Sequence, residues 1–97
     1  MFSPLISIIV RTKNEDHWIG KCLNEIFNQQ YKNFEVILVD NNSKDKTISI
    51  VKKNFPKVKI INYKSKTFFP GKALNLGIKK SKGQLIAMIS GHCIPKN

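Results

Sequence analysis

The chain of 97 residues carries 17 lysine and arginine side chains against six acidic ones, a formal net charge of +11 at pH 7. Its length allows one domain with a single core. With 41% hydrophobic and 24% charged residues, the composition excludes a disordered or low-complexity chain. No apolar run approaches the ~20 residues that a membrane-spanning helix needs, so any contact with a membrane is expected to be peripheral.

The positive charge raises the question of an anionic partner, such as nucleic acid, a phosphate-bearing ligand or a membrane surface. All but one of the basic residues are lysine, and Arg11 is the exception. Base-edge and bidentate phosphate recognition favour arginine, so this composition argues against nucleic acid as the partner. Cys22 and Cys93 have neither a metal-binding nor a redox spacing, which favours reduced thiols and a cytoplasmic location.

The first half of the chain predicts two strands and a helix between them. The runs 5–10 and 34–40 are continuously apolar and rich in β-branched residues, as expected of strands covered on both faces. Between them, a helical stripe of apolar residues that includes Trp18 begins after Asn14. We expect Asn14 to cap this helix and Trp18 to pack in the core.

The second half repeats the pattern. Ser43 is expected to cap a second helix that Pro56 ends. The run 58–63 alternates in part, which is typical of a strand nearer the sheet edge. Residues 68–83 are interpreted as a loop and a short helix, and 84–89 as a fully buried strand.

This order of strands and helices is a repeated βαβ pattern. Right-handed crossovers then favour a parallel sheet with helices on both faces, a three-layer α/β/α sandwich. In such open sheets the ligand binds beyond the carboxyl ends of the strands. The positions of interest are therefore 11–14, 40–43, the loop 64–72, and 90–93.

The two common nucleotide-binding motifs of α/β proteins are absent. The turn after the first strand, "RTKNED", contains no glycine that would let a pyrophosphate approach the backbone, and the spacing from Gly71 to Gly77 is not that of a P-loop. What remains is a carboxylate, Asp40, at the end of the second strand. It can accept hydrogen bonds from a base N–H and a ribose hydroxyl, or it can cap the following turn.

Three stretches then resemble one family in order and spacing: "SIIVRTKNE", "NFEVILVDNNSKDKT" and "GKALNLGIKKSKGQLIAMIS". They are similar to the nucleotide-sugar-binding half of family 2 glycosyltransferases, which are inverting enzymes with the Rossmann-like GT-A fold. The resemblance spans nearly the whole chain. It implies a sheet of order 3-2-1-4 and one domain, 1–97, that is truncated before the acceptor half.

The resemblance also implies a site for a nucleoside diphosphate sugar of the UDP or dTDP type. Asp40 corresponds to the aspartate that binds the base, and Ser43 and Asp45 match an "S-x-D" at the start of the second helix. The donor-binding residues implied in this way are Arg11, Thr12, Lys13, Asn14, Asp40, Asn41, Ser43, Lys72, Asn75, Ser90 and Gly91.

A metal site is implied at the end of the fourth strand, where the family carries its D-x-D signature. Here the three positions are Ser90, Gly91 and His92, which resembles the S-x-H of a rhamnosyltransferase-like bacterial branch. His92 is the implied metal ligand. Imidazole suits Mn²⁺ better than Mg²⁺, which prefers oxygen ligands. In a site without metal, Lys72, Lys66 or Arg11 would supply the positive charge to the diphosphate.

The implied reaction transfers a sugar, as in a hexosyltransferase, to an acceptor glycan or a lipid-linked saccharide during polysaccharide or glycolipid assembly. It would take place in the cytoplasm, at the inner face of a membrane. In the family the catalytic base lies well downstream of the D-x-D position, so we expect no catalytic residue in these 97 residues and no activity from them alone. A non-catalytic nucleotide-binding module, or less readily a basic nucleic-acid-binding domain, stays open as an alternative.

Overall fold

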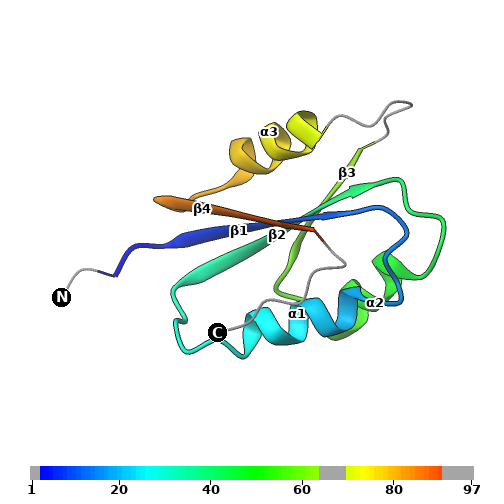
Figure 1. Ribbon diagram of the computed structural model, residues 1–97, viewed down its shortest axis with the longest axis horizontal. Helices are drawn as coiled ribbons and strands as arrows, with labels where there is room; N and C mark the ends of the chain where they lie inside the picture. The colour runs from blue at the N-terminus through cyan, green and yellow to red at the C-terminus, as the bar shows by residue number, and fades with distance from the viewer. Residues whose placement is uncertain (1–2, 64–69, 91–97) are drawn as a thin grey trace.

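The computed structural model describes residues 3–63 and 70–90, with side chains from Asn75 onward in the second range. These residues form a parallel sheet of order β3-β2-β1-β4, with α1 and α2 together on one face and α3 on the other (Figure 1). The sandwich and its strand order are therefore confirmed. The elements are β1 (Ile6–Thr12), α1 (Ile19–Phe27), β2 (Phe34–Asn41), α2 (Thr47–Asn54), β3 (Lys59–Tyr63), α3 (Pro70–Lys80) and β4 (Leu85–Ser90).

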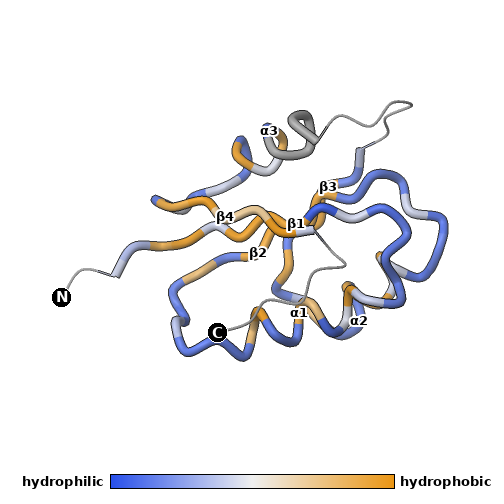
Figure 2. The backbone as a smooth tube through the Cα atoms, viewed as in Figure 1, coloured by the Kyte–Doolittle hydropathy of each residue, from blue (hydrophilic) through white to orange (hydrophobic). Residues whose placement is uncertain are grey.

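Two apolar layers hold the sheet and helices together. The larger lies between the sheet and the α1–α2 pair, where Leu23, Ile26 and Leu38 are almost fully buried. The smaller, under α3, centres on Ile9 and Ile37. The apolar strands run through the middle of the molecule (Figure 2). Burying a side chain of this size contributes about 1.5–3 kcal/mol, so the two layers hold the helices against the sheet.

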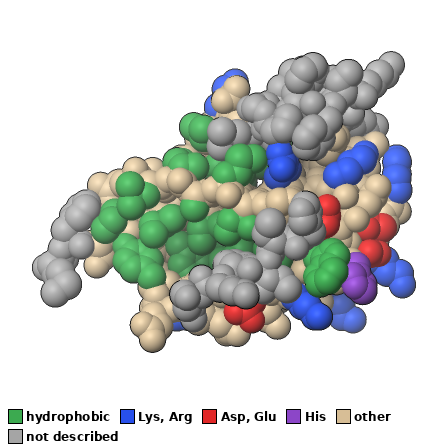
Figure 3. Space-filling model, in the orientation of Figure 1, with side chains coloured by type: hydrophobic (Ala, Val, Ile, Leu, Met, Phe, Trp, Pro, Cys, Tyr) green, Lys and Arg blue, Asp and Glu red, His purple; other side chains and the backbone are tan. Residues whose placement is uncertain are grey.

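Strand β4 differs from the expectation that it is fully buried. Leu85, Ile86 and Met88 are 54%, 41% and 38% exposed. The reason is that β4 is an edge strand and α3 packs on β1 and β2. Hydrophobic side chains consequently gather on the surface around β4 and β1 (Figure 3). The prediction that the strand at 58–63 lies at an edge is confirmed by β3.

Helix α1 begins later than the sequence pattern predicts. Asn14 does not cap it: this residue has a left-handed backbone, with φ of 53°, and α1 starts five residues further on at Ile19. Trp18, expected in the core, is 39% exposed at the start of the helix. Asn14 is instead held by the loop after β2, because the Lys44 N–H donates to its side-chain oxygen. Cys22, as expected, is buried in the core.

The N-cap residue of helix α2 is Lys46, and the side chain that accepts the first N–H of the helix is that of Asp45 rather than Ser43. The Thr47 N–H donates to Asp45 Oδ1 over 2.9 Å, and the Thr47 hydroxyl donates to the same oxygen. Ser43 lies further from the helix and is bonded to Asp40. The loops that follow β1 and β2 are therefore bonded to each other and to the end of β2. None of the helices in the described ranges is long and apolar enough to cross a bilayer.

Candidate functional site

The carboxyl ends of all four strands meet at one edge of the sheet. Thr12 pairs in register with Asp40, which pairs with Asn62, while Arg11 pairs with Ser90. Two adjoining pockets open at this edge. The smaller, of about 100 Å³, is lined by Arg11, Thr12, Lys13, Glu15, Asn41, Tyr63 and Ser90. The larger, of about 270 Å³, is lined by Asp40, Asn42, Ser43, Ile48, Asn62 and Tyr63.

Asp40 is the centre of a buried hydrogen-bond network. Its Oδ1 accepts the hydroxyls of Thr12 and Ser43, each over 2.6 Å, and its Oδ2 accepts the Ser43 N–H over 2.9 Å. Asp40 is only 1% exposed. It therefore caps the turn that follows β2, one of the two roles considered for it. A carboxylate has about four acceptor positions, so these three bonds leave one position, on Oδ2, among the described residues.

The loops after β1 and β2 are joined by reciprocal hydrogen bonds. The Asn14 N–H donates to Ser43 Oγ over 2.8 Å, and the Glu15 N–H donates to Thr47 Oγ1 over 2.8 Å. The Asp16 N–H donates to Asp45 Oδ2. Burial acts to raise the pKa of Asp45, but the hydrogen bonds from Thr47 and Asp16 outweigh it and lower the pKa. Asp45 thus organises the loops rather than facing either pocket.

The smaller pocket contains the cationic groups of the site. Arg11 and Lys13 line it, and the Lys13 ammonium donates to the Asn41 carbonyl over 3.0 Å. Glu15 is the acidic residue on the same wall. The lining therefore carries a net positive charge next to the hydroxyl of Ser90, which suits an anionic group of a ligand.

Eight of the predicted donor-binding residues come together at this edge. Seven of them line the pockets, and Asn14 joins them through Ser43. Asn75 is exposed on α3 and lines neither pocket. Four predictions lie outside what the structure describes: Lys66, the Lys72 side chain, Gly91 and His92.

Tyr63 is one of the lining residues that the sequence pattern left out. It ends β3, pairs in register with Asn41 and lines both pockets, with its ring packed against the layer under α3. Ligands of such sheets bind at the carboxyl ends of strands, where Tyr63 lies, but the loop predicted to follow this strand began at residue 64. Glu15 and Asn62 were missed in the same way, since the first was assigned to a helix and the second to the interior of a strand.

The family of this chain follows from comparison with known proteins. A model of the family described as "Glycosyl transferase family 2" matches residues 7–97. The chain belongs to glycosyl transferase family 2. The resemblance seen in its strand ends is thereby confirmed over nearly its whole length.

Two relatives illustrate the range of the family. A protein of Methanococcus voltae named "Dolichyl N-acetyl-alpha-D-glucosaminyl phosphate 3-beta-D-2,3-diacetamido-2,3-dideoxy-beta-D-glucuronosyltransferase" is 38% identical over 99 residues, covering 94% of this chain and 30% of the relative. The poly(ribitol-phosphate) β-N-acetylglucosaminyltransferase TarS of Staphylococcus aureus is 32% identical over 86% of the chain and 15% of its own length. The chain thus spans a third or less of each relative.

Solved structures confirm the GT-A fold. The crystal structure of S. aureus TarS 1-349 matches with a TM-score of 0.83 and 30% identity, covering 92% of this chain and 28% of TarS 1-349. TarS 1-349 has also been solved with UDP and with UDP-GlcNAc. A mannosyltransferase from Pyrobaculum calidifontis, in complex with GDP-Man and Mn²⁺, matches with a TM-score of 0.87 over 99% of this chain and 30% of its own. At 24% identity that likeness concerns the fold alone.

Proposed function

We propose that this chain is the donor-binding part of a glycosyltransferase that moves a sugar from a nucleoside diphosphate to an acceptor glycan or lipid-linked saccharide. The observation that carries the proposal is the grouping of an acid, hydroxyls, an aromatic ring and two cations at the carboxyl edge of the sheet in a family 2 chain. The related TarS binds UDP and UDP-GlcNAc. Polysaccharide or glycolipid assembly at the inner face of a membrane is part of the same proposal.

The larger pocket is the proposed place of the base. Tyr63 offers a ring on which a base can stack, and such stacking contributes about 1–3 kcal/mol. Asp40 Oδ2 offers its one remaining acceptor position. Uracil and thymine present a single ring N–H between two carbonyls, whereas guanine presents a ring N–H and an amino group side by side. A single acceptor therefore matches UDP or dTDP better than GDP.

The smaller pocket is the proposed place of the diphosphate. Arg11 and Lys13 bring positive charge to it, and Ser90 brings a hydroxyl donor. The same groups would stabilise the charge that develops on the departing diphosphate. Lys72, Asn75 and Gly91 stay predictions for this end of the donor, and no residue of the chain is assigned the role of catalytic base.

A divalent metal at the leaving group would neutralise its charge. The described residues do not by themselves fit such an ion, because they contain no group of three His, Cys, Asp or Glu side chains able to hold one. Ser90 contributes a neutral hydroxyl, and two hydroxyls already occupy Asp40 Oδ1. His92 as a ligand of Mn²⁺ stays a prediction.

Isothermal titration of the 97-residue chain with UDP, dTDP and GDP tests the proposal. We expect UDP or dTDP to bind, and GDP to bind at least about fivefold more weakly, since one unmatched hydrogen-bonding group is worth at least about 1 kcal/mol. The matched control is uridine, which lacks the diphosphate and should bind more weakly than UDP. Absence of heat with all three nucleotides, even at millimolar concentration, would contradict the donor-site assignment.

A further inference from the structure

The charge of the chain is divided unevenly along the sequence. All six acidic residues lie within the first 45 positions, whereas twelve of the 17 basic residues follow them. Helix α2 accordingly carries Lys52 and Lys53 in its last turn, and Lys57 precedes β3. All three are exposed. The donor pockets use Arg11 and Lys13, so these three lysines have no part in the proposed function.

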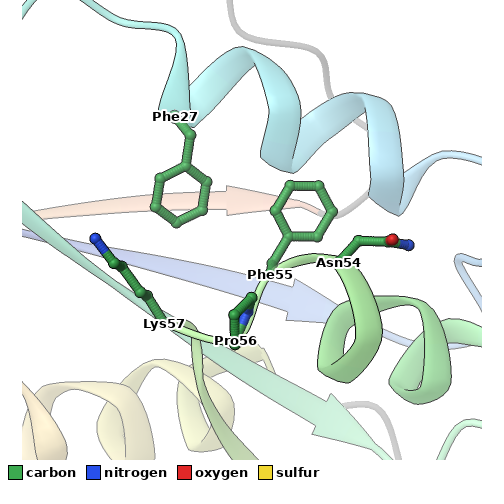
Figure 4. A pocket seen from close by; sticks show the side chains of 5 residues that line it. All are labelled: Phe27, Asn54, Phe55, Pro56 and Lys57. Carbon is green, nitrogen blue, oxygen red and sulfur yellow. The ribbon is translucent and has the colours of Figure 1, made fainter.

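An apolar chamber opens beside these lysines. Phe27 from the end of α1 faces Phe55 from the end of α2, with ring planes 14° apart and centroids separated by 6.0 Å (Figure 4). Asn54, Pro56 and Lys57 complete the lining of a chamber of about 290 Å³. Because it lies at the carboxyl ends of α1 and α2, which run antiparallel to the strands, it is at the opposite end of the sheet from Asp40.

A second, polar chamber continues the first along the two helices. It measures about 400 Å³, shares Asn54 and Phe55 with the apolar chamber, and adds Gly20, Lys21 and Asn24 from α1. Together the two chambers form a groove that we call the α1–α2 groove. One end of it offers apolar rings, and the other offers amides and a lysine.

The groove has more lysines around it than are required to balance the partial negative charges at the carboxyl ends of α1 and α2. Each helix carboxyl end carries roughly half a negative charge. Lys32 already donates to the Phe27 carbonyl over 2.9 Å, and Lys52 and Lys53 stand in the last turn of α2. Glu25 is the exposed acid on α1, while Glu35 is bonded to Lys59 over 3.4 Å. The rim therefore keeps a net positive charge that suits an anionic partner.

Trp18 extends this surface at the amino end of α1. Its side chain is 39% exposed, and the Lys21 ammonium lies 5.7 Å from its ring centroid. Exposed tryptophan with neighbouring lysines is typical of surfaces that meet the boundary between lipid and water, where the ring and the lysine stem are half apolar.

We infer that the α1–α2 groove and its lysines dock on an anionic membrane surface. The apolar chamber takes part of an acyl chain, and the adjoining polar chamber and lysines bind lipid phosphates. An apolar chamber continuous with a cationic, polar one reproduces the order of tail and headgroup in a phospholipid, which favours lipid over an acidic protein segment. The inference names a surface for the membrane contact in the proposed function, and it places that surface away from the donor pockets.

Flotation of the 97-residue chain with vesicles tests the inference. We expect binding to phosphatidylcholine vesicles that contain phosphatidylglycerol, weaker binding in high salt, and none to pure phosphatidylcholine. Trp18 is the only tryptophan, so its fluorescence should shift to the blue on binding. Absence of flotation with anionic vesicles would overturn the inference. So would equal binding to soluble polyglutamate, since that would indicate an acidic polymer as the partner.

Two matched triple variants locate the surface. Each lysine near an anionic membrane is worth roughly a fivefold change in partitioning, so Lys52→Gln/Lys53→Gln/Lys57→Gln should lose about a hundredfold. The control, Lys79→Gln/Lys80→Gln/Lys82→Gln, removes the same charge from α3 and the turn after it, on the other face of the sheet. It should partition nearly as the parent chain does. Equal losses in both variants would overturn the assignment to the α1–α2 groove.

UDP titration of the first variant separates this inference from the donor site. Lost vesicle binding with unchanged UDP affinity is the result expected. If the parent chain binds vesicles, the variant does not, and neither binds UDP, the donor-site proposal fails and the docking surface stands.

Discussion

The Thr12 hydroxyl donates a 2.6 Å hydrogen bond to Asp40 Oδ1, joining the carboxyl ends of β1 and β2 side by side. Both residues are about 1% exposed, so the bond forms away from water. Together with Ser43 it fixes the carboxylate and leaves one acceptor position on Oδ2. Thr12 is therefore a positioning residue for Asp40, and under the proposed donor site we expect base selectivity to depend on it.

Replacing Thr12 by valine tests that role. Thr12→Val keeps the shape of the side chain but removes a hydrogen bond to a carboxylate, which should lower the free energy of unfolding by about 1.5–3 kcal/mol. It also frees an acceptor position on Oδ1, so a second donor of guanine can be matched. We expect the preference for UDP over GDP to narrow, measured by calorimetry.

Thr47→Val is the control, because the Thr47 hydroxyl is equally buried and donates to Asp45 instead. Since Thr47 Oγ1 also accepts the Glu15 N–H, this variant should lower stability by more than Thr12→Val does, yet leave the ratio of UDP to GDP affinity unchanged. If both variants change that ratio alike, Thr12 has no specific part in base selection.

Tyr63 is expected to stack on the base. Removing the ring in Tyr63→Leu should weaken UDP binding by about 1–3 kcal/mol, roughly 5- to 150-fold. Tyr31→Leu removes a tyrosine that is 38% exposed and bonded to the Pro4 carbonyl, far from both pockets. It should bind UDP as the parent chain does. A Tyr63→Leu chain with parental UDP affinity would exclude stacking.

Glu35 should make stability depend on pH at the acidic end. Burial acts to raise its pKa, but hydrogen bonds from the Lys82 N–H, Ser7 and Lys59 outweigh it and lower the pKa. A folded pKa below the unfolded one means that the stabilisation is present above the unfolded value, about 4.3, and is lost as the pH falls through the folded value.

Chemical denaturation across this range measures the effect. The parent chain should lose stability below about pH 4, and Glu35→Gln should be less stable near neutral pH and show a flatter profile. Glu25→Gln, at an exposed position of α1, is the control and should keep the parental slope. An unchanged slope in Glu35→Gln would show that other carboxylates cause the acid loss.

Two glycines allow close packing on β1, and replacing each by alanine should lower the stability of the chain by a different amount. A Cβ at Gly77 would lie 2.7 Å from both Cδ1 and Cγ2 of the Ile9 side chain, which can shift more readily than backbone, whereas one at Gly83 would lie 2.6 Å from the Ser7 backbone nitrogen. Overpacking lowers the free energy of unfolding by about 1–3 kcal/mol. At Gly77, which lies in α3, the higher helix propensity of alanine offsets up to ~1 kcal/mol of this loss. Thermal unfolding should therefore show a larger loss for Gly83→Ala than for Gly77→Ala, and Ile9→Val should recover part of the latter. The reverse order of losses would contradict the packing described for β1.

Local sequence patterns predicted the elements well and their surroundings less well. The apolar runs located all four strands, since burial in a parallel sheet needs such runs. The same pattern could not show that β4 lies at an edge, because exposure depends on which neighbours the fold supplies. Asn14 and Ser43 look like helix caps locally, yet each bonds to the other's loop, and Ser43 also donates to Asp40 at the end of its own strand.

In the candidate site, too, local patterns predicted the positions of residues but not their contacts. Strand ends can be identified from sequence, so Thr12, Asp40 and Ser90 were correctly placed together. Which acceptor positions of Asp40 are already used depends on contacts between separate loops, and no spacing rule encodes them. Tyr63 was missed because the predicted loop began one residue after it.

Mapping UDP binding by NMR tests the central claim most directly. In ¹⁵N-labelled chain, amide shifts that saturate with UDP should lie at the carboxyl edge of the sheet, in 11–15, 40–43 and 62–63. Residues around the α1–α2 groove should be unaffected by UDP. Saturable shifts confined to the groove, or no saturable shift anywhere, would contradict the assignment of this edge as the donor site.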